Sequence, residues 1–309
     1  MFVGFSFFSW CINAIGLILT MQKIRITGVP EHFNYPWLQV IEQQPFLDEG
    51  IELVWQEESR GSGAMNRALR DGSTDIALVL TESFIKDRIE GNPSRIIGFH
   101  IASPLIWGIH ISARSPQSSL TELEDIPFLI SRYGSGSHLM AFLLAQREGW
   151  ASDKLKFEVI DNLDGAKKAF ENPEPKMFLW EKYTTKPLVD AGQFKRVGEI
   201  PTPWPCFVIV VTEQILETHT EVLVRLRDMV YAFAAKMTQD KDFPATISKT
   251  YGIKEEDIKA WLKQTRWETK NIIEAENLVN TIKILRGLNL IKAEVTFLDL
   301  IDDRIIEIK

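Results

Sequence analysis

Glycine and serine alternate at positions 134–137, between a short apolar run and a stretch with helical spacing of apolar residues. Glycine permits unusual backbone angles and serine is a favoured helix N-cap, so this pattern predicts a strand, a loop and then a helix. The first turn of such a helix has free N–H groups and the positive end of the helix dipole, which suit a carboxylate, sulfonate or phosphate. The alternative is an ordinary capped connection without a ligand. The spacing fits neither a Walker loop nor a dinucleotide-binding motif.

A second turn of the same kind lies at residues 61–63, Gly-Ser-Gly, and it predicts a second helix N-terminus. Residues 75–80 form a continuous apolar run typical of a buried strand, and Thr-Glu-Ser follows at 81–83 with exposed hydroxyls. The segment 28–37, GVPEHFNYPW, comes directly after a strand-like stretch at 23–27. Open α/β sheets bind ligands where their strands end, so all three segments are candidates for a ligand site.

Motifs of catalysis and metal binding are absent from the sequence. There is no His-Glu-x-x-His, nucleophile elbow or kinase motif, and five histidines are spread over the chain without metal-ligand spacing. Only Cys11 and Cys206 are present, which excludes a disulfide framework and a Cys-rich metal site. We therefore predict no catalytic residue, no metal and no cofactor. Acid–base catalysis by groups brought together on folding remains the alternative.

Strand-like and helix-like segments alternate through the chain, which predicts parallel sheets with crossover helices. Residues 38–47 have a helical pattern, as does a stripe from Leu223 to Met237 behind a Thr220 cap. Two apolar strands within 96–113 are joined by residues 102–105 without a helix, and prolines are frequent at 201–205. We interpret both segments as crossings between two lobes, formed by residues 21–105 with 203–309 and by residues 106–202.

Residues 1–20 form an apolar leader that carries no charge and lacks both a basic start and a small-residue cleavage site. Three interpretations are open: an anchor, an export segment, or a start-site artefact in which translation begins at Met21. We favour the last, which predicts a cytoplasmic protein. The net charge of −7 and the lack of a dense Lys/Arg run exclude nucleic acid and a polybasic membrane contact as expected partners.

The order of these segments resembles the type II periplasmic-binding-protein fold. The resemblance rests on RGSGAMNRALRDGSTDIALV, RYGSGSHLMAFLLAQREGW and MFLWEKYTTKPLVDAG, and on the apolar strand at residues 207–211. More narrowly, the chain is similar to the binding proteins for nitrate, sulfonate, taurine and the thiamine pyrimidine precursor. The opening GVPEHFNYPW resembles a subgroup found in fungi and bacteria that lacks an export signal. The fold implied is two doubly wound α/β lobes joined by two crossings, with a ligand cleft between them.

The resemblance also implies where ligand-binding residues lie. One wall of the cleft would carry Asn34, Ser62 and Thr81, and the crossings would carry Ser103 and Trp204. The other wall would be lined by Tyr133, Ser135, Gly136, Ser137, Trp180 and Glu181. Relatives that make the thiamine pyrimidine use a Cys-rich motif, which this chain lacks, so that reaction is disfavoured.

The main hypothesis is a monomeric solute-binding protein that closes its lobes on a small anionic or heteroaromatic molecule. One alternative is a cytosolic enzyme on the same fold, resembling the menaquinone-pathway lyases, with an acid or base among Glu31, Glu82, Glu181 and His32. Another is a cytoplasmic sensor that reports ligand occupancy to a partner protein. A membrane permease would be the partner if the protein serves transport.

Overall fold

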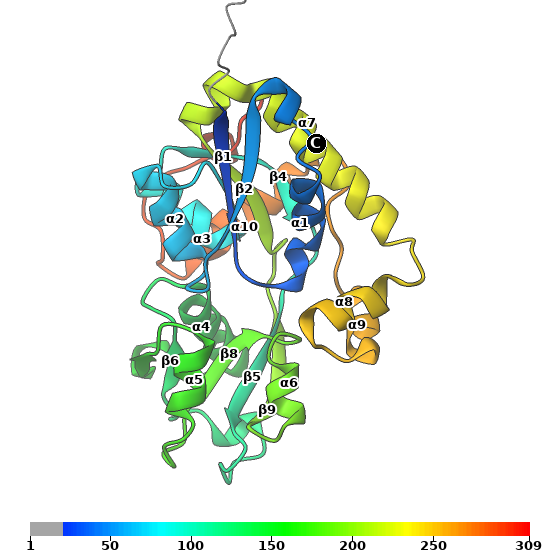
Figure 1. Ribbon diagram of the computed structural model, residues 1–309. Helices are drawn as coiled ribbons and strands as arrows, with labels where there is room; N and C mark the ends of the chain where they lie inside the picture. Colours follow the sequence, from blue (N-terminus) through cyan, green and yellow to red (C-terminus); the bar gives the residue numbers. More distant parts are fainter. Residues whose placement is uncertain (1–20) are drawn as a thin grey trace, which may run out of the picture.

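The computed structural model describes residues 21–309, so the predictions about residues 1–20 lie outside the described part. Two five-stranded sheets form the centres of two α/β lobes, one above the other in Figure 1. The first sheet is built from the strands before residue 102 and one later strand, and the second from the strands between. Two short connections, 102–105 and 202–206, carry the chain from one sheet to the other.

The first lobe has the strand order β2-β1-β3-β10-β4. Its strands are β1 (Gln22–Gly28), β2 (Ile51–Glu57), β3 (Ile76–Leu80), β4 (Ser94–Ile101) and β10 (Phe207–Thr212). Its helices are α1 (Tyr35–Glu42), α2 (Ser62–Asp71), α3 (Thr81–Ile89) and α7 (Glu213–Met237). Alternate residues of β3 face opposite sides of the sheet. Ile76 and Leu78 pack in a core with α1 and α7. Ala77 and Val79 pack in a second core with α2 and α3. This two-sided burial explains why the strand is apolar throughout.

The second lobe has the strand order β7-β6-β8-β5-β9. Its strands are β5 (Ile106–Ser112), β6 (Phe128–Ile130), β7 (Phe157–Val159), β8 (Met177–Glu181) and β9 (Phe194–Pro201). Its helices are α4 (Gly136–Glu148), α5 (Leu163–Ala169) and α6 (Lys186–Asp190). Leu139, Met140 and Ala141 of α4 are buried in the same core as the residues of β3 and β4 that pack on α2 and α3 of the first lobe.

The prediction of parallel sheets is only partly right, because each sheet is mixed. Strand β10 is antiparallel to β3 and β4, and β5 is antiparallel to β8 and β9. Phe207, the first residue of β10, pairs with Leu80, the last residue of β3. The chain therefore enters the first sheet at the edge where β3 leaves it, and must run in the opposite direction.

Two helix boundaries differ from the predicted ones. Helix α1 begins at Tyr35, inside the expected loop, because Pro36 occupies the first turn, where its missing N–H costs nothing. Helix α7 begins at Glu213 rather than near Thr220, and it is broken at His219, where φ is −135°. The cap-like sequence at Thr220 thus coincides with a kink inside one long helix.

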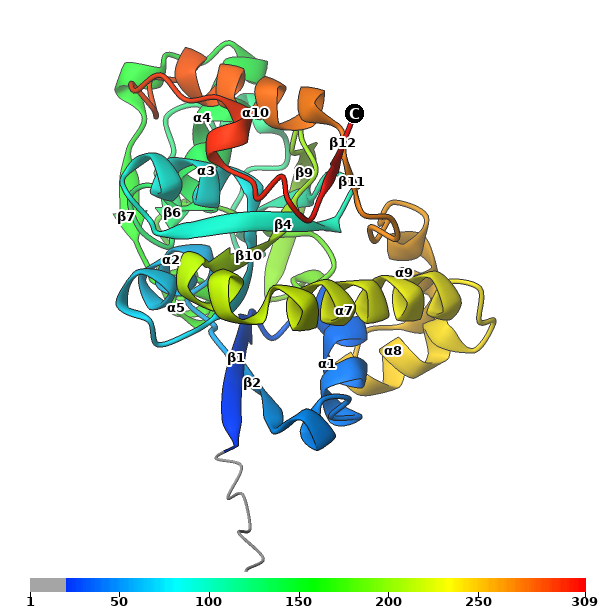
Figure 2. The same ribbon diagram turned by 90° about the horizontal axis from the view of Figure 1, so that it is seen from above.

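The C-terminal segment extends the first lobe and reaches the second. It contains α8 (Phe243–Tyr251), α9 (Glu255–Leu262), α10 (Ala275–Gly287), β11 (Ile272–Ile273) and β12 (Glu307–Ile308). Helices α8 and α9 lie beside the gap between the two sheets (Figure 1), and α7 crosses one face of the first sheet (Figure 2). Side chains of α9 and its neighbours contact α6: Lys186 Nζ lies 3.3 Å from Asp257 Oδ2, and Lys254 Nζ lies 2.9 Å from Asp190 Oδ2. The lobes are therefore in contact on this side.

Between residues 21 and 309 no helix is both long and apolar enough to cross a bilayer.

Candidate functional site

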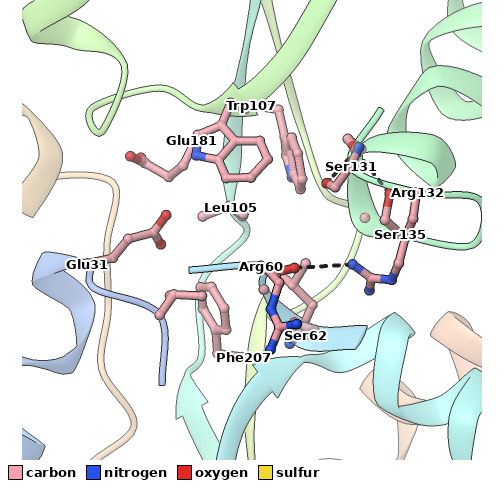
Figure 3. A pocket seen from close by; sticks show the side chains of 16 residues that line it. Glu31, Arg60, Ser62, Leu105, Trp107, Ser131, Arg132, Ser135, Glu181 and Phe207 are labelled. Atoms are coloured by element: carbon pink, nitrogen blue, oxygen red, sulfur yellow. Dashed lines mark hydrogen bonds between the residues drawn. The ribbon is translucent and has the colours of Figure 1, made fainter. Parts of the chain in front are cut away.

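A cavity of about 60 Å³ lies between the two sheets, where strands of both lobes end (Figure 3). In this measure one water needs about 10–15 Å³, so the cavity has room for a small molecule only. Its lining comes from both lobes and from the start of β5, which follows the first crossing. The lining residues are Val29, Glu31, Arg60, Gly61, Ser62, Leu80, Leu105, Trp107, Ser131, Arg132, Ser135, Gly136, Ser137, Trp180, Glu181 and Phe207.

The N-terminus of α4 forms one wall. Ser135 is the N-cap, and its hydroxyl accepts a hydrogen bond of 3.3 Å from the N–H of His138. The N–H groups of Gly136 and Ser137 have no acceptor among residues 21–309. A Cβ atom on Gly136 would lie 2.7 Å from Leu80 Cδ1 and 3.2 Å from the Trp107 ring, so glycine lets the helix start approach the other lobe. Two backbone donors at a positive helix end thus face the cavity.

Three serine hydroxyls support this wall. The Ser137 hydroxyl accepts the N–H of Ser131 at 3.0 Å, and the hydroxyls of Ser131 and Ser135 lie 3.1 and 3.0 Å from it. All three side chains are buried. Because the Ser137 hydroxyl already fixes the loop backbone, its first function is to hold the helix start in place. The backbone N–H groups are the donors left for a ligand.

The N-terminus of α2 meets the cavity from the first lobe. Its N-cap is Gly61, with φ of 75°, and no side chain caps the helix. The Ser62 hydroxyl instead accepts the N–H of Leu80 at 2.9 Å, which ties the helix start to the end of β3. In the described part of the chain the N–H groups of Ser62 and Gly63 have no acceptor. The cavity therefore lies between two helix starts, one from each lobe, of which α2 has no side-chain cap and α4 is capped by Ser135.

Two arginines lie on the same side of the cavity (Figure 3). Arg60 is neutralised by Glu58, with Nε 2.8 Å from Oε1 and Nη2 2.6 Å from Oε2. Arg132 forms no ion pair with residues 21–309; its Nη1 donates to the carbonyl of Arg60 across the cleft at 3.2 Å. A Cβ atom on Gly63 would lie 1.7 Å from Arg132 Nη2, so this glycine leaves the space that the guanidinium occupies. Burial and the nearby Arg67 lower the pKa of Arg132.

Two carboxyl groups, those of Glu31 and Glu181, lie at the opposite side of the cavity (Figure 3). Glu181 ends β8 and is 3% exposed; its Oε2 accepts N–H bonds of 2.9 Å from Tyr183 and 2.5 Å from Thr184. Burial raises the pKa of Glu181 to about 7, although these N–H bonds oppose the rise. Burial and the charge of Glu181 raise the pKa of Glu31 to about 8. Both groups thus hold protons at far higher pH than ordinary carboxyls do.

Apolar and aromatic side chains separate the two sides. Trp107, Leu105 and Phe207 are buried, and Trp180 is half-buried. The indole N–H of Trp107 is buried without a hydrogen-bond partner in residues 21–309. A cavity with apolar walls and a few converging polar groups is the usual form of a small-molecule site.

Six of the residues expected from the sequence line this cavity: Ser62, Ser135, Gly136, Ser137, Trp180 and Glu181. The other five lie outside it. Asn34 is buried and donates to the Val29 carbonyl at 2.7 Å, and the hydroxyl of Thr81 donates to the Pro205 carbonyl at 2.6 Å. Both polar groups are therefore used in holding the segments around the site.

Ser103 and Trp204 lie in the crossings, as expected, but face protein rather than the cavity. The Ser103 hydroxyl accepts the N–H of Arg266 at 3.0 Å, and Trp204 Nε1 donates to Glu82 Oε2 at 2.9 Å. Tyr133 is 65% exposed and packs edge-on against His138 and Phe157. Of the proposed acids and bases, His32 lies outside the cavity, packed on Trp261 and Phe33, and burial lowers its pKa to about 3. Glu82 lies outside it as well.

Comparison with solved structures places this fold in a class. The conserved CA3427 gene product of Candida albicans, which has the generic periplasmic-binding-protein fold, matches with a TM-score of 0.81 and 23% identity over 93% of this chain and 97% of that chain. The alkanesulfonate-binding protein SsuA of Xanthomonas axonopodis pv. citri, bound to MOPS, matches with a TM-score of 0.74 and 12% identity over 91% and 98%. PhnD1 of Prochlorococcus marinus, in complex with methylphosphonate, matches with a TM-score of 0.60 and 12% identity over 87% and 99%.

The chain therefore has the periplasmic-binding-protein fold, and the predicted fold class is confirmed. Within it, residues 107–200 match the family model described as Ca3427-like PBP, where PBP denotes a periplasmic binding protein. That match covers the second lobe from β5 to β9. A search of curated proteins found no match.

Proposed function

We propose that this protein is a solute-binding protein that holds a small molecule with an anionic group between its two lobes. The observation that carries the proposal is the convergence of two helix N-termini, α2 and α4, on one cavity. Three residues of the cavity lining, Ser62, Gly136 and Ser137, have backbone N–H groups with no acceptor in the described chain. A helix start is a favourable site for sulfonate, phosphonate or carboxylate, and here two of them face the same space.

Arg132 adds the charge that the backbone lacks. Its half-buried guanidinium lies against Gly63 and forms no ion pair within residues 21–309, whereas Arg60 is already neutralised by Glu58. A hydrogen bond between a charged group and its partner contributes about 1.5–3 kcal/mol in proteins. An anion bound by both helix starts and Arg132 would therefore hold the two lobes together, because its donors come from both.

Closure of the lobes is part of the proposal. The crossings at 102–105 and 202–206 are the expected hinge, and the lobe boundaries at 105/106 and 202/203 follow from them. The bonds from Arg132 to Arg60 and from Lys254 to Asp190 correspond to a closed arrangement, since each joins the two lobes. The likeness to structures with bound MOPS and methylphosphonate supports an anionic ligand for this cavity as well.

Calorimetric titration tests the anion site. The probes are propane-1-sulfonate and propylphosphonate, and sulfonate buffers are avoided because they would compete. We expect saturable binding by the native chain, and Arg132→Gln should weaken it about ten- to a hundredfold. Arg67→Gln is the control, since Arg67 is an exposed arginine of α2 that does not line the cavity. Absence of binding at millimolar concentration, or equal losses in both variants, would contradict the proposal.

A second candidate function is favoured by the carboxyl pair. The pKa values of Glu31 and Glu181, about 8 and 7, suit general acid–base catalysis near neutral pH. Native mass spectrometry of freshly purified protein would identify a co-purified small molecule. If that molecule stays chemically unchanged on incubation, the protein is a binder. Conversion that stops in Glu31→Gln would establish an enzyme.

A further inference from the structure

The loop that leads into α4 is closed by two reciprocal hydrogen bonds. The N–H of His138 donates to the hydroxyl of Ser135 at 3.3 Å, and the N–H of Gly134 donates to Nδ1 of the His138 ring at 3.0 Å. His138 is the third residue of the helix after the cap Ser135. In a capping box a glutamate or glutamine at this position accepts a backbone N–H near the cap. Here an imidazole takes that place, so the closure of the loop depends on the protonation of the ring.

The bond from Gly134 determines the protonation state of the ring. A backbone N–H can only donate, so Nδ1 is the unprotonated nitrogen and the ring proton lies on Nε2. Burial and the charge of Lys86 lower the pKa of His138, so the ring is neutral near neutral pH. In mildly acidic solution histidine is the side chain that gains a proton. Protonation of Nδ1 would bring two donors together and break the bond from Gly134.

The neighbours of the ring are three aromatic side chains and one lysine. The aromatic rings pack edge-on against the imidazole at centroid distances of 5.3, 5.0 and 4.6 Å, and they are those of Tyr133, Phe142 and Phe157. The charged neighbour is Lys86 of α3, which belongs to the other lobe. Its Nζ lies against the loop, since a Cβ atom on Gly134 would be only 2.9 Å away. A charged imidazole would therefore meet a like charge across the boundary between the lobes.

No carboxylate near the ring compensates such a charge. Glu90 is exposed and pairs with Lys86 at 3.3 Å, and Arg132 in the same loop is another cation. Glu82 lines, together with His138 and Lys86, a cavity of about 10 Å³ to which α10 and the residues after it contribute leucine side chains alone. Burial raises the pKa of Glu82 to about 7. Glu82 is therefore already protonated, and uncharged, at the pH at which His138 takes up its proton.

We propose that His138 is a positioning residue of the anion site, and that its protonation in mildly acidic solution loosens the start of α4 and weakens ligand binding. This inference rests on the proposed function, because the loop that His138 closes presents the free N–H groups of Gly136 and Ser137. The ring does not line the cavity between the lobes, so it acts through the loop. A charged ring would also attract an anion, but only across the helix turn, whereas loss of the Gly134 bond displaces the donors themselves.

Proton and ligand then oppose one another at this site. Bound ligand holds the N–H groups of α4 in place and favours the neutral ring, whereas the proton favours the loosened loop and the open arrangement of the lobes. The coupling is reciprocal, so ligand lowers the proton affinity of His138 by the same factor as the proton lowers the ligand affinity. A side chain that only packs in the helix start would show neither effect.

The experiment measures both sides of this coupling. The probe is propane-1-sulfonate, which stays ionised in mildly acidic solution, and the buffers contain no sulfonate. Calorimetric titration at about pH 7.5 and about pH 5 gives the affinities, and we expect binding to be about three- to tenfold weaker at the lower pH. NMR titration of the His138 ring protons with and without the probe gives the pKa of His138, which should be lower in the complex.

His138→Asn is the matched variant, because the asparagine amide oxygen can accept the N–H of Gly134 and does not titrate. It should bind the probe with about native affinity at both pH values. Lys86→Gln removes the like charge of the other lobe, so it should reduce the loss of affinity at the lower pH. His219→Asn is the control, since His219 belongs to α7 and lines neither cavity, and it should keep the native pH profile.

The outcomes separate this inference from the proposed function. Native affinity that is unchanged or higher at the lower pH would overturn the role of His138 and leave the anion site standing. A ring pKa that the probe leaves unchanged or raises would overturn that role as well, without the use of any variant. A loss of affinity in acid that persists in folded His138→Asn protein would overturn the assignment to this residue. Absence of binding at both pH values would contradict the anion site, and the positioning role with it.

Discussion

The two ends of the cavity are built by different kinds of segment. The N–H end consists of backbone at two helix starts, and each start is encoded by a run of three or four neighbouring glycine and serine residues. The carboxyl end consists of two side chains, Glu31 and Glu181, that lie 150 positions apart and meet only when the lobes face one another. The anion site that we propose therefore depends on local sequence, whereas the carboxyl pair exists only when the two lobes face one another.

The most damaging change to the N–H end is Gly136→Asp. Its Cβ would lie 2.7 Å from Leu80 Cδ1, and its carboxylate would compete with the ligand for the free N–H groups. We expect loss of probe binding by more than about a hundredfold, with the fold kept because an acidic residue is favourable at a helix start. Calorimetry with propane-1-sulfonate measures this loss.

The control for that variant is Gly287→Asp. Gly287 ends α10, and a Cβ there would meet no atom within 4 Å. It introduces the same charge without entering the cavity, so affinity should be unchanged. Native affinity in folded Gly136→Asp protein would show that the start of α4 is a structural connection and no ligand site.

The carboxyl end should reveal itself in the pH dependence of stability. Glu31 and Glu181 have pKa values raised to about 8 and 7, so the folded state binds protons more tightly than the unfolded chain does. Their stability contribution is complete below the unfolded pKa of about 4.5 and is lost as pH rises through the folded values. The slope reaches about 1.4 kcal/mol per pH unit for each proton.

Urea unfolding of the ligand-free protein at several pH values between about 5 and 8 measures that slope. Glu31→Gln should flatten it and raise stability at the alkaline end, since the amide cannot ionise. The acidic end should change less, because at about pH 5 the unfolded chain begins to bind the same proton. An unaltered slope in the variant would mean that Glu31 is not a proton-holding member of the pair.

The Gly-Ser residues at the starts of α2 and α4 can be predicted from the sequence to lie near a ligand site, whereas most other lining residues of the cavity cannot. Gly-Ser runs indicate helix starts because capping and backbone freedom are local, and Ser62, Ser135, Gly136 and Ser137 all line the cavity. Trp180 and Glu181, which also line the cavity, were expected only from the resemblance to the binding-protein family. Sequence spacing carries no such information about which loop of one lobe faces which loop of the other.

Arg132 and Tyr133 illustrate the limit. They are adjacent in the same loop, yet Arg132 crosses to Gly63 of the other lobe while Tyr133 is largely exposed. Their positions before a Gly-Ser run do not distinguish them.

Three apolar residues at the crossings also line the cavity without being predicted, namely Leu105, Trp107 and Phe207. Their apolar strands predict packing in the core and give no sign of a ligand site. The alternation of strands and helices predicts the two lobes, but it does not predict that β5 and β10 are antiparallel to their neighbours. The direction of these strands depends on the edge at which each crossing enters its sheet.

A smaller effect on affinity is expected at Ser62, because its side chain stabilises the fold and only its backbone N–H is free for a ligand. Ser62→Ala removes the acceptor of the Leu80 N–H, and an unsatisfied buried N–H costs about 1–3 kcal/mol of stability. Affinity for propane-1-sulfonate should fall much less, because the free N–H of residue 62 remains. Ser135→Ala is the comparison: it loses a cap and should cost about 1 kcal/mol of stability. A large loss of affinity with little loss of stability would mean that the Ser62 hydroxyl contacts the ligand directly.

The smallest expected effect concerns the contact between α6 and α9, which joins the lobes outside the cavity. Asp190 accepts Lys186 within α6 and Lys254 from the C-terminal segment, and Lys186 also reaches Asp257. Exposed ion pairs contribute about 0–1 kcal/mol, so Asp190→Asn should hardly alter unfolding but should favour the open form of the free protein. Small-angle scattering would then give a larger radius of gyration without probe and the native value at saturation. Asp164→Asn, which breaks the exposed pair with Lys167 inside one lobe, should leave both values native. An Asp190→Asn protein whose radius is native in both states would show that this contact does not bias closure.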